Sequence, residues 1–229
     1  MIAPLAQTDQ PFIIWSWIGD HASDIASRGL QHVELTLLAV GLGLAISLPL
    51  AILAHRHRRF LGPITSIASV LYTIPSLALI SLLVTITGFS YVTVVIPLTT
   101  YTLLILIRNT VAGLEGVPGD AKDAALGMGY TPRQMLWRVE VPLAMPVIIA
   151  GVRIATISTI GLITIAALIG RGGFGEFILE GLQTLFWTPL LLGSVLSVAL
   201  ALVADLLLIG VGRLATPWVR SSGTRAIAT

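Results

Sequence analysis

Few residues in this chain have the type and spacing that covalent or metal chemistry requires. The chain has no cysteine, which excludes disulfides, thiolate metal sites and cysteine nucleophiles. Its four histidines lie outside the long apolar runs and near no carboxylate pair at ligand spacing; they are His21, His32, His55 and His57. The sequence contains no GxxxxGK[ST] phosphate loop and no nucleophile–base pair. We therefore expect no enzyme activity and no metal or cofactor bound by this chain.

The glycine-rich stretch Gly170–Glu176 comes closest to a nucleotide-binding loop. It places four glycines within six residues, but no strand pattern precedes it. We therefore interpret the stretch as a bent, re-entrant turn that helps to shape the outer mouth of a membrane path.

The elements that position these residues are predicted to be membrane helices. Hydrophobic residues make up 55% of the 229-residue chain and charged residues only 10%, against about 25% charged in soluble domains. A membrane helix needs about 20 predominantly apolar residues. Five stretches qualify, at 33–54, 61–87, 91–108, 142–169 and 189–212. The sequence thus predicts an all-α integral membrane protein with about five transmembrane helices and no soluble catalytic domain.

The remaining segments flank this predicted transmembrane domain, which covers residues 33–214. Residues 1–32 include Trp15 and Trp17 and predict a segment that lies at the lipid headgroups on the outer side. Residues 215–229 are predicted to be a cytoplasmic tail. No Lys or Arg precedes the first apolar run, so we expect no cleavable signal peptide.

Lys and Arg residues gather on one predicted side of the membrane. Ten follow the first, third and fifth predicted helices: Arg56, Arg58, Arg59, Arg108, Lys122, Arg133, Arg138, Arg213, Arg220 and Arg225. The opposite side carries two, Arg28 and Arg171, and Arg153 lies within a helix. By the positive-inside rule the N-terminus is predicted to face out, and the loop of about 109–141 and the C-terminus to face the cytoplasm.

The stretch DAALGMGYTPRQ, from Asp123 to Gln134, is a polar island in this cytoplasmic loop. Asp120 is expected to cap a short helix that Gly127 and Gly129 then end. Thr131 is expected to cap a second short helix, with proline at its first position and glutamine at its third. The island is thus predicted to be two short helices joined by a glycine elbow.

The first of these helices is expected to expose a smooth alanine face, formed by Ala121, Ala124 and Ala125. Such a face, bordered by Lys122 and Arg133, suits insertion into a groove on a partner protein. An ordinary solvated loop is the alternative that these residues leave open.

The spacing of the island resembles the EAA loop of binding-protein-dependent ABC-importer permeases, whose pattern is EAA-x3-G-x9-I-x-LP. Asp123-Ala124-Ala125 is followed after three residues by Gly129, and after nine more by Val139, one residue and Val141-Pro142. Asp, Val and Val replace Glu, Ile and Leu of the pattern. Longer segments within about 65–185 are similar to the osmoprotectant branch, which carries glycine betaine, carnitine or choline. They are YTIPSLALISLL, IRNTVAGLEGVP, PLAMPVIIAGVRIAT and ALIGRGGFGEFILEGL.

This resemblance implies a type I ABC-importer permease (MetI-like) fold and a set of partners. Two permease subunits, identical or homologous, would form the path, and an extracytoplasmic solute-binding protein would deliver the cargo. Cytoplasmic ATPases, which use ATP and Mg, would bind the EAA helix and move the bundle. Carried over by position, the coupling residues would be Lys122, Asp123, Ala124, Ala125, Gly127, Gly129, Arg133 and Pro142. No nucleic-acid partner is expected.

Four polar or aromatic residues lie in spans near Pro75 and Pro97, where kinks could open a path; they are Tyr72, Thr73, Ser76 and Tyr101. Aromatic faces suit a quaternary ammonium cargo through cation–π attraction. Ordinary hydrogen bonds between membrane helices are the alternative role. Two charges, Arg153 and Asp205, also lie within apolar runs, and we favour a structural pairing because a buried arginine would repel a cationic cargo.

The predicted function is therefore the permease subunit of an osmoprotectant importer in the cell inner membrane. A permease of the same fold for methionine or another amino acid is one alternative. An ATP-independent membrane channel, whose cytoplasmic loop binds no ATPase, is an alternative from another class.

Overall fold

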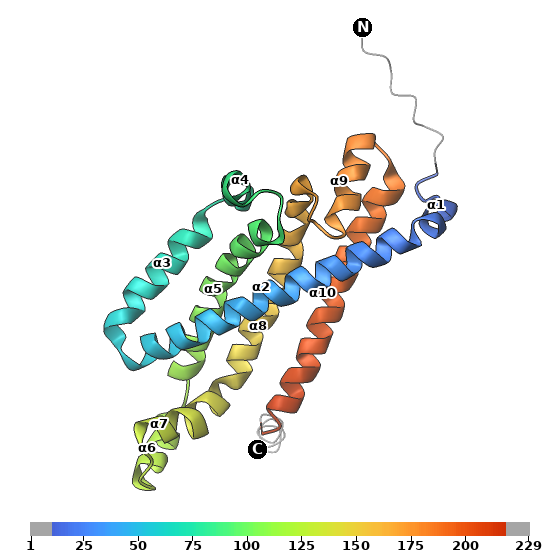
Figure 1. Cartoon of the computed structure of the whole chain (residues 1–229). Coiled ribbons are helices and arrows are strands. Elements are labelled where there is room, and N and C mark those ends of the chain that lie inside the picture. Colours follow the sequence, from blue (N-terminus) through green and yellow to red (C-terminus); the bar gives the residue numbers. More distant parts are fainter. Residues whose placement is uncertain (1–10, 219–229) are drawn as a thin grey trace.

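The computed structural model describes residues 11–218, whose regular elements are all helices, as predicted. Their bounds are α1 Trp15–Asp20, α2 Ala22–Arg56, η1 Arg58–Phe60, α3 Leu61–Thr73, α4 Ser76–Thr87, α5 Tyr91–Glu115, α6 Gly119–Gly127, α7 Pro132–Met135, η2 Leu136–Glu140, α8 Val141–Ile163, η3 Thr164–Ile169, α9 Gly175–Thr184 and α10 Trp187–Ala215. Figure 1 shows α6 and α7 at one end of the bundle, with α4 and α9 at the other. Most of the predicted tail, including Arg220 and Arg225, lies outside the described residues.

Within residues 11–218, four helical segments are long and apolar enough to cross a membrane: α2, α5, the run 132–169 and α10. A fifth span requires the pair 58–73 and 76–87, whose axes bend by 87°. The predicted stretch 61–87 is therefore a bent pair of helices, broken at the kink that the sequence predicts near Pro75. Pro75 holds Ile74 in an extended conformation, with φ −67° and ψ 125°, and has no N–H to donate to the preceding turn.

Other helix boundaries also differ from the predicted ones. α2 begins at Ala22 and has 35 residues, so at about 1.5 Å per residue it is about 52 Å long. That length exceeds the apolar thickness of a bilayer, about 30 Å, and Figure 1 shows α2 running diagonally across the bundle. The predicted span 142–169 belongs to a helical run that starts at Pro132, and the amphipathic helix α9 was not predicted.

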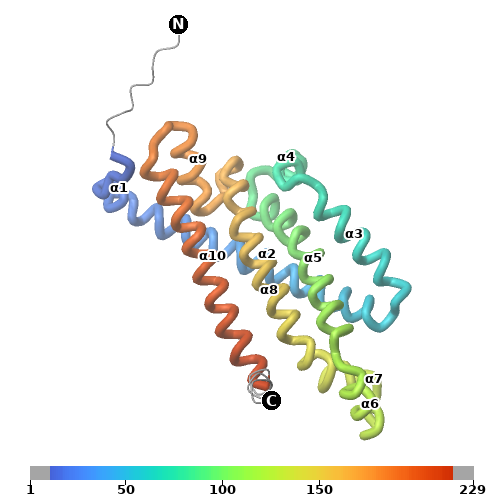
Figure 2. The backbone as a smooth tube through the Cα atoms, turned by 180° about the vertical axis from the view of Figure 1, so that it is seen from behind, coloured from blue at the N-terminus to red at the C-terminus, as the bar shows by residue number. Residues whose placement is uncertain are grey.

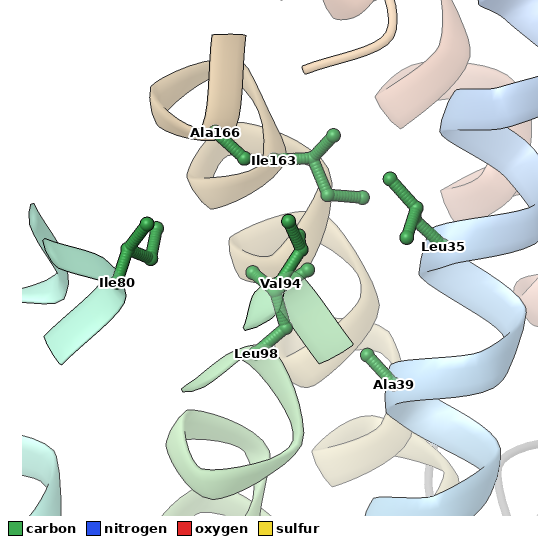
Figure 3. Close-up of a cluster of buried hydrophobic side chains, with 7 residues drawn as sticks. All are labelled: Leu35, Ala39, Ile80, Val94, Leu98, Ile163 and Ala166. Carbon is green, nitrogen blue, oxygen red and sulfur yellow. The ribbon is translucent and has the colours of Figure 1, made fainter. Parts of the chain in front are cut away.

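The core forms around α5, which packs most extensively against α2 and α8 and is the most buried span. Figure 3 shows a cluster in which α2, α4, α5, α8 and η3 meet, formed by Leu35, Ala39, Ile80, Val94, Leu98, Ile163 and Ala166. α10 is the least buried span, and its buried residues all lie in its first half. The seven side chains are all aliphatic, so they stabilise this part of the bundle by apolar packing.

A glycine allows the close approach of α2 to α5. A Cβ atom on Gly43 would lie 1.9 Å from Thr102 Oγ1 and 3.0 Å from Thr102 Cβ. Gly41, on the same helix, has nothing within 4 Å of the corresponding position. Small residues at such contacts let membrane helices pack closely.

We expect Gly43→Ala to destabilise the purified chain by about 1–3 kcal/mol, because the added methyl group overpacks the α2–α5 contact. Gly41→Ala is the matched control and should leave stability unchanged or slightly raised, because alanine lowers the backbone entropy of the unfolded chain. Thermal unfolding in detergent measures both variants. Equal unfolding temperatures for the two would contradict the close packing of α2 on α5.

The stretch Gly170–Glu176 forms the bent turn that the sequence predicts, and it folds back onto α2. The Gly173 N–H donates to Gln31 Oε1 at 3.1 Å, and the Phe174 N–H donates to His32 Nδ1 at 3.3 Å. His32 is fully buried, and its Nε2 lies 3.1 Å from the Ile160 carbonyl oxygen of α8. His32 therefore joins this turn to two of the long helices, whereas its place at the edge of an apolar run had indicated no such role. That the turn Gly170–Glu176 lies at the outer mouth of a membrane path stays a prediction.

Candidate functional site

The polar island folds as two short helices joined by a glycine elbow, as predicted. α6 ends at Gly127, and Gly129 has a φ of +79°, a conformation that residues with a Cβ atom rarely adopt. The Gly129 N–H donates to the Leu126 carbonyl at 2.9 Å. α7 starts with the predicted capping box, in which the Gln134 N–H donates to Thr131 Oγ1 at 3.4 Å and the Thr131 N–H donates to Gln134 Oε1 at 2.8 Å.

Two details of the predicted first helix are wrong. Pro118 is the N-cap of α6 and offers no side-chain cap, so Asp120 lies inside the first turn, where its charge still favours the helix dipole. Ala125 is only 1% exposed, because α6 packs against η2 and α7 of the same chain. The alanine stripe therefore does not form one exposed face.

The exposed part of α6 instead carries two apolar side chains that sequence reasoning missed. Leu126 is 57% exposed and Met128 is 66% exposed, and we call this pair the apolar knob. The predicted coupling residues that are exposed around it are Asp123, Ala124, Gly127, Gly129 and Arg133. Large apolar side chains exposed within an otherwise polar segment are candidates for a protein contact. The available sequence signal was the presence of two large apolar residues within a polar stretch.

Lys122, predicted to contact a partner, is engaged within its own chain. Its Nζ lies 3.1 Å from Glu140 Oε1, and Glu140 Oε2 lies 3.5 Å from His55 Nε2. Glu140 is 8% exposed and belongs to the π-helical segment η2. π-Helical turns are rare in proteins, and those that occur are often found at functional sites. The sequence offers no reason to name Glu140 and places His55 near no carboxylate pair, because the two residues meet only in the tertiary fold.

Pro142 lies in the first turn of α8, but it does not begin the helical run. The chain is helical from Pro132 to Ile169, passing through η2. An apolar cluster at this junction contains Leu114, Val117, Leu136, Ala144 and Ile148, with Leu48 and Ile52 packed against it. The island is therefore attached to α2, α5 and α8 by a packed core.

The four predicted path residues lie around or near the break between α3 and α4. The Tyr101 hydroxyl of α5 donates to the Ile74 carbonyl, which the break leaves without a helical partner. The Tyr72 and Tyr101 rings meet edge to face, with centroids 5.7 Å apart. Tyr72 is 42% exposed and Tyr101 is 6% exposed. The kink expected at Pro75 is confirmed, whereas α5 continues through Pro97.

Beside the break, Ser76 begins α4 and Thr73 ends α3. The Thr73 hydroxyl donates to the Val70 carbonyl within its own helix, at 2.7 Å. This bond lies within α3, whereas the Tyr101 bond to Ile74 joins two helices, which is the ordinary role that the sequence left open. Contact with a cargo stays a prediction for all four residues.

The two intramembrane charges form the pair that the sequence favoured. Arg153 Nε donates to Asp205 Oδ1 at 2.7 Å, and Arg153 Nη2 donates to Asp205 Oδ2 at 2.9 Å. This two-bond geometry is the strongest that arginine and a carboxylate adopt. The pair joins α8 to the second half of α10.

Comparison with known proteins identifies relatives across most of the chain. Residues 41–214 match the family described as "Binding-protein-dependent transport system inner membrane component". The chain is 37% identical over 194 residues to the osmoprotectant import permease protein OsmW of Salmonella typhimurium, covering 82% of this chain and 90% of that protein. It is 34% identical over 205 residues to the choline transport system permease protein OpuBB of Bacillus subtilis, covering 89% and 94%. It is 37% identical over 193 residues to the carnitine transport permease protein OpuCB of Listeria monocytogenes, covering 84% and 88%.

The fold is also similar to that of a solved structure. A chain of the MetNI methionine ABC transporter, in an inward-facing conformation, matches with a TM-score of 0.73 and 20% identity, covering 84% of this chain and 96% of that chain. At this identity the likeness concerns the fold alone. The family match at 41–214 includes the polar island, the helix break at Pro75 and the Arg153–Asp205 pair.

Proposed function

The chain belongs to the family of binding-protein-dependent transport system inner membrane components, and we propose that its cargo is an osmoprotectant such as glycine betaine, carnitine or choline. It is a multi-pass transport permease of the inner membrane and not an enzyme. The observation that carries the proposed cargo is 34–37% identity to osmoprotectant, choline and carnitine permeases over at least 82% of this chain.

In this proposal the end of the bundle that carries α6 and α7 faces the cytoplasm. Figures 1 and 2 place α6, α7 and the end of α10 at the same end of the bundle. Eight of the ten basic residues on the predicted inner side lie within the described residues. Lys122 and Arg133 belong to α6 and α7, Arg56 donates to the Pro132 carbonyl of α7, and Arg58 pairs with Glu115 at the end of α5. This distribution supports an outer N-terminus and an inner C-terminus by the positive-inside rule.

Three partners follow from this function. A cytoplasmic ATPase would dock on the apolar knob and the exposed residues of α6, and would hydrolyse ATP with Mg. A second permease, identical or homologous, would complete the path. A solute-binding protein would approach the opposite end of the bundle, where α9 and the turn Gly170–Glu176 lie (Figure 1).

The cargo would pass the aromatic pair at the α3–α4 break. Tyr72 exposes 42% of its surface there, and Tyr101 holds the break open by its bond to Ile74. An electron-rich ring face attracts a quaternary ammonium group without requiring any hydrogen-bond donor from it. This supports a path for solutes that carry a quaternary ammonium group.

Uptake into proteoliposomes tests the proposal. The chain, its ATPase and its binding protein are reconstituted together and tested with glycine betaine, carnitine, choline and methionine at equal concentrations. We expect uptake of at least one quaternary amine, dependent on ATP and on the binding protein, and no uptake of methionine.

Two results would contradict parts of this proposal separately. Methionine uptake without quaternary-amine uptake would contradict the proposed cargo but not the proposal that the chain is part of an importer. Solute flux through the permease alone, unaffected by ATP, would indicate a channel and would contradict the proposal of an ATP-driven importer. Likeness to the methionine transporter does not favour the first result, because 20% identity concerns the fold alone.

A further inference from the structure

Glu140 joins three separate elements at the end of the bundle that carries the polar island. One carboxylate oxygen lies 3.1 Å from Lys122 Nζ of α6, and the other lies 3.5 Å from His55 Nε2 in the last turn of α2. Glu140 itself ends η2, directly before α8. The Glu140 side chain thus links α6, the last turn of α2 and the junction of η2 with α8.

The three side chains are largely removed from solvent. The Glu140 side chain is 11% exposed, that of His55 is 12% exposed and that of Lys122 is 26% exposed. Electrostatic interactions strengthen as the surrounding dielectric falls, so this cluster is held more tightly than an ion pair in water. The exposed pair Arg58–Glu115 at the same end, with side chains 66% and 36% exposed, offers a comparison.

A second contact holds the same two regions together. Arg56, next to His55, donates from Nη2 to the Pro132 carbonyl at the start of α7, at 3.2 Å. The end of α2 is therefore attached both to α7 and to η2. The π-helical winding of η2 adds a residue to the turn, and such segments are places where a helix can repack.

We propose that Glu140 is a positioning residue that transmits movement of α6 to α2 and α8. This rests on the proposed function, in which an ATPase moves α6. When α6 is pulled, Lys122 draws the Glu140 carboxylate with it, and Glu140 moves both η2, on which α8 continues, and the end of α2. The Lys122 ammonium acts on its own chain and leaves the contact with the ATPase to the apolar knob.

The test is a double-mutant cycle in the reconstituted importer. Lys122→Met, Glu140→Gln and the double variant are each assayed for ATPase co-purification, ATP hydrolysis and uptake per ATP hydrolysed. Glu115→Gln, which removes the charge of the exposed pair, is the matched control. Thermal unfolding in detergent identifies any variant that fails to fold.

We expect Lys122→Met and Glu140→Gln each to lower uptake per ATP by about fivefold or more, in the range of typical coupling energies. The double variant should lose no more than either single one, because both substitutions break the same link. Co-purification of the ATPase and the unfolding temperature should stay near wild type, and Glu115→Gln should match wild type throughout.

Three results would overturn the proposal. Losses that multiply in the double variant would mean that the two residues act independently. Loss of ATPase binding in Lys122→Met alone would assign Lys122 to the interface. Uptake losses that follow the unfolding temperature would reduce Glu140 to a stability role. If wild type itself shows no ATP-dependent uptake, the proposed function fails instead.

Discussion

Replacing Leu126 with aspartate should abolish ATP-driven uptake while the permease remains folded. Leu126 is 57% exposed, beside Met128, which is 66% exposed, at the end of α6. Figure 1 shows α6 at the tip of the bundle. Because these side chains bury little surface within their own chain, an aspartate at position 126 should lower the folding stability of the permease only slightly. It would, however, be placed in the apolar centre of the contact with the ATPase.

The expected loss is large because few residues dominate such a contact. The few residues that dominate an interface cost about 2–4 kcal/mol when altered, which weakens binding by about 30-fold to 1,000-fold, and we expect Leu126 to be one of them. Co-purification of the ATPase with tagged permease measures this loss directly, and ATP-dependent uptake should fall with it.

Two controls separate this effect from general damage. Leu126→Met keeps an apolar side chain and should retain uptake. Leu214→Asp introduces the same charge at an 83%-exposed leucine near the end of α10, away from α6, and should retain ATPase binding. If Leu126→Asp still co-purifies the ATPase at wild-type levels, the apolar knob is not the docking surface.

The sequence predicted those features that depend on local chemistry. The glycine elbow and the capping box of Thr131 were predicted because left-handed backbone and caps each require particular residue types. The membrane helices were predicted because a helix of about 20 apolar residues matches the thickness of the bilayer's hydrocarbon core. The pairing of Arg153 with Asp205 was favoured because an unpaired arginine on the path would repel a cationic cargo, and the structure shows the pair.

Features that depend on how distant segments meet were not predicted. The burial of Ala125 follows from packing on η2, and the Glu140 cluster brings together residues from α2, α6 and η2. The 87° break at Pro75 was expected only as a kink, since proline is tolerated in many membrane helices and neighbouring groups decide the angle. Here the Tyr101 hydroxyl satisfies the Ile74 carbonyl and so stabilises the break.

Removing one partner of the Arg153–Asp205 pair should greatly reduce the yield of folded permease. α10 is the least buried span, and its buried residues, Thr188, Pro189, Gly193 and Ser197, all lie before the pair. The two hydrogen bonds of 2.7 and 2.9 Å therefore provide a directional attachment for the second half of this helix. Arg153→Leu would leave the Asp205 carboxylate without a counter-charge in an apolar span, which is costly.

The pair predicts an unequal effect of the two single substitutions and a rescue by the double one. Asp205→Leu should be milder than Arg153→Leu, because the long arginine side chain can extend toward the membrane surface. The variant Arg153→Leu/Asp205→Leu should recover most of the yield, since replacing both charges of an ion pair in an apolar environment by apolar side chains is often neutral. Size-exclusion profiles in detergent measure folded yield, and uptake per folded permease measures function. If the double variant folds well but loses uptake, the pair serves transport directly, and the structural role assigned to it is wrong.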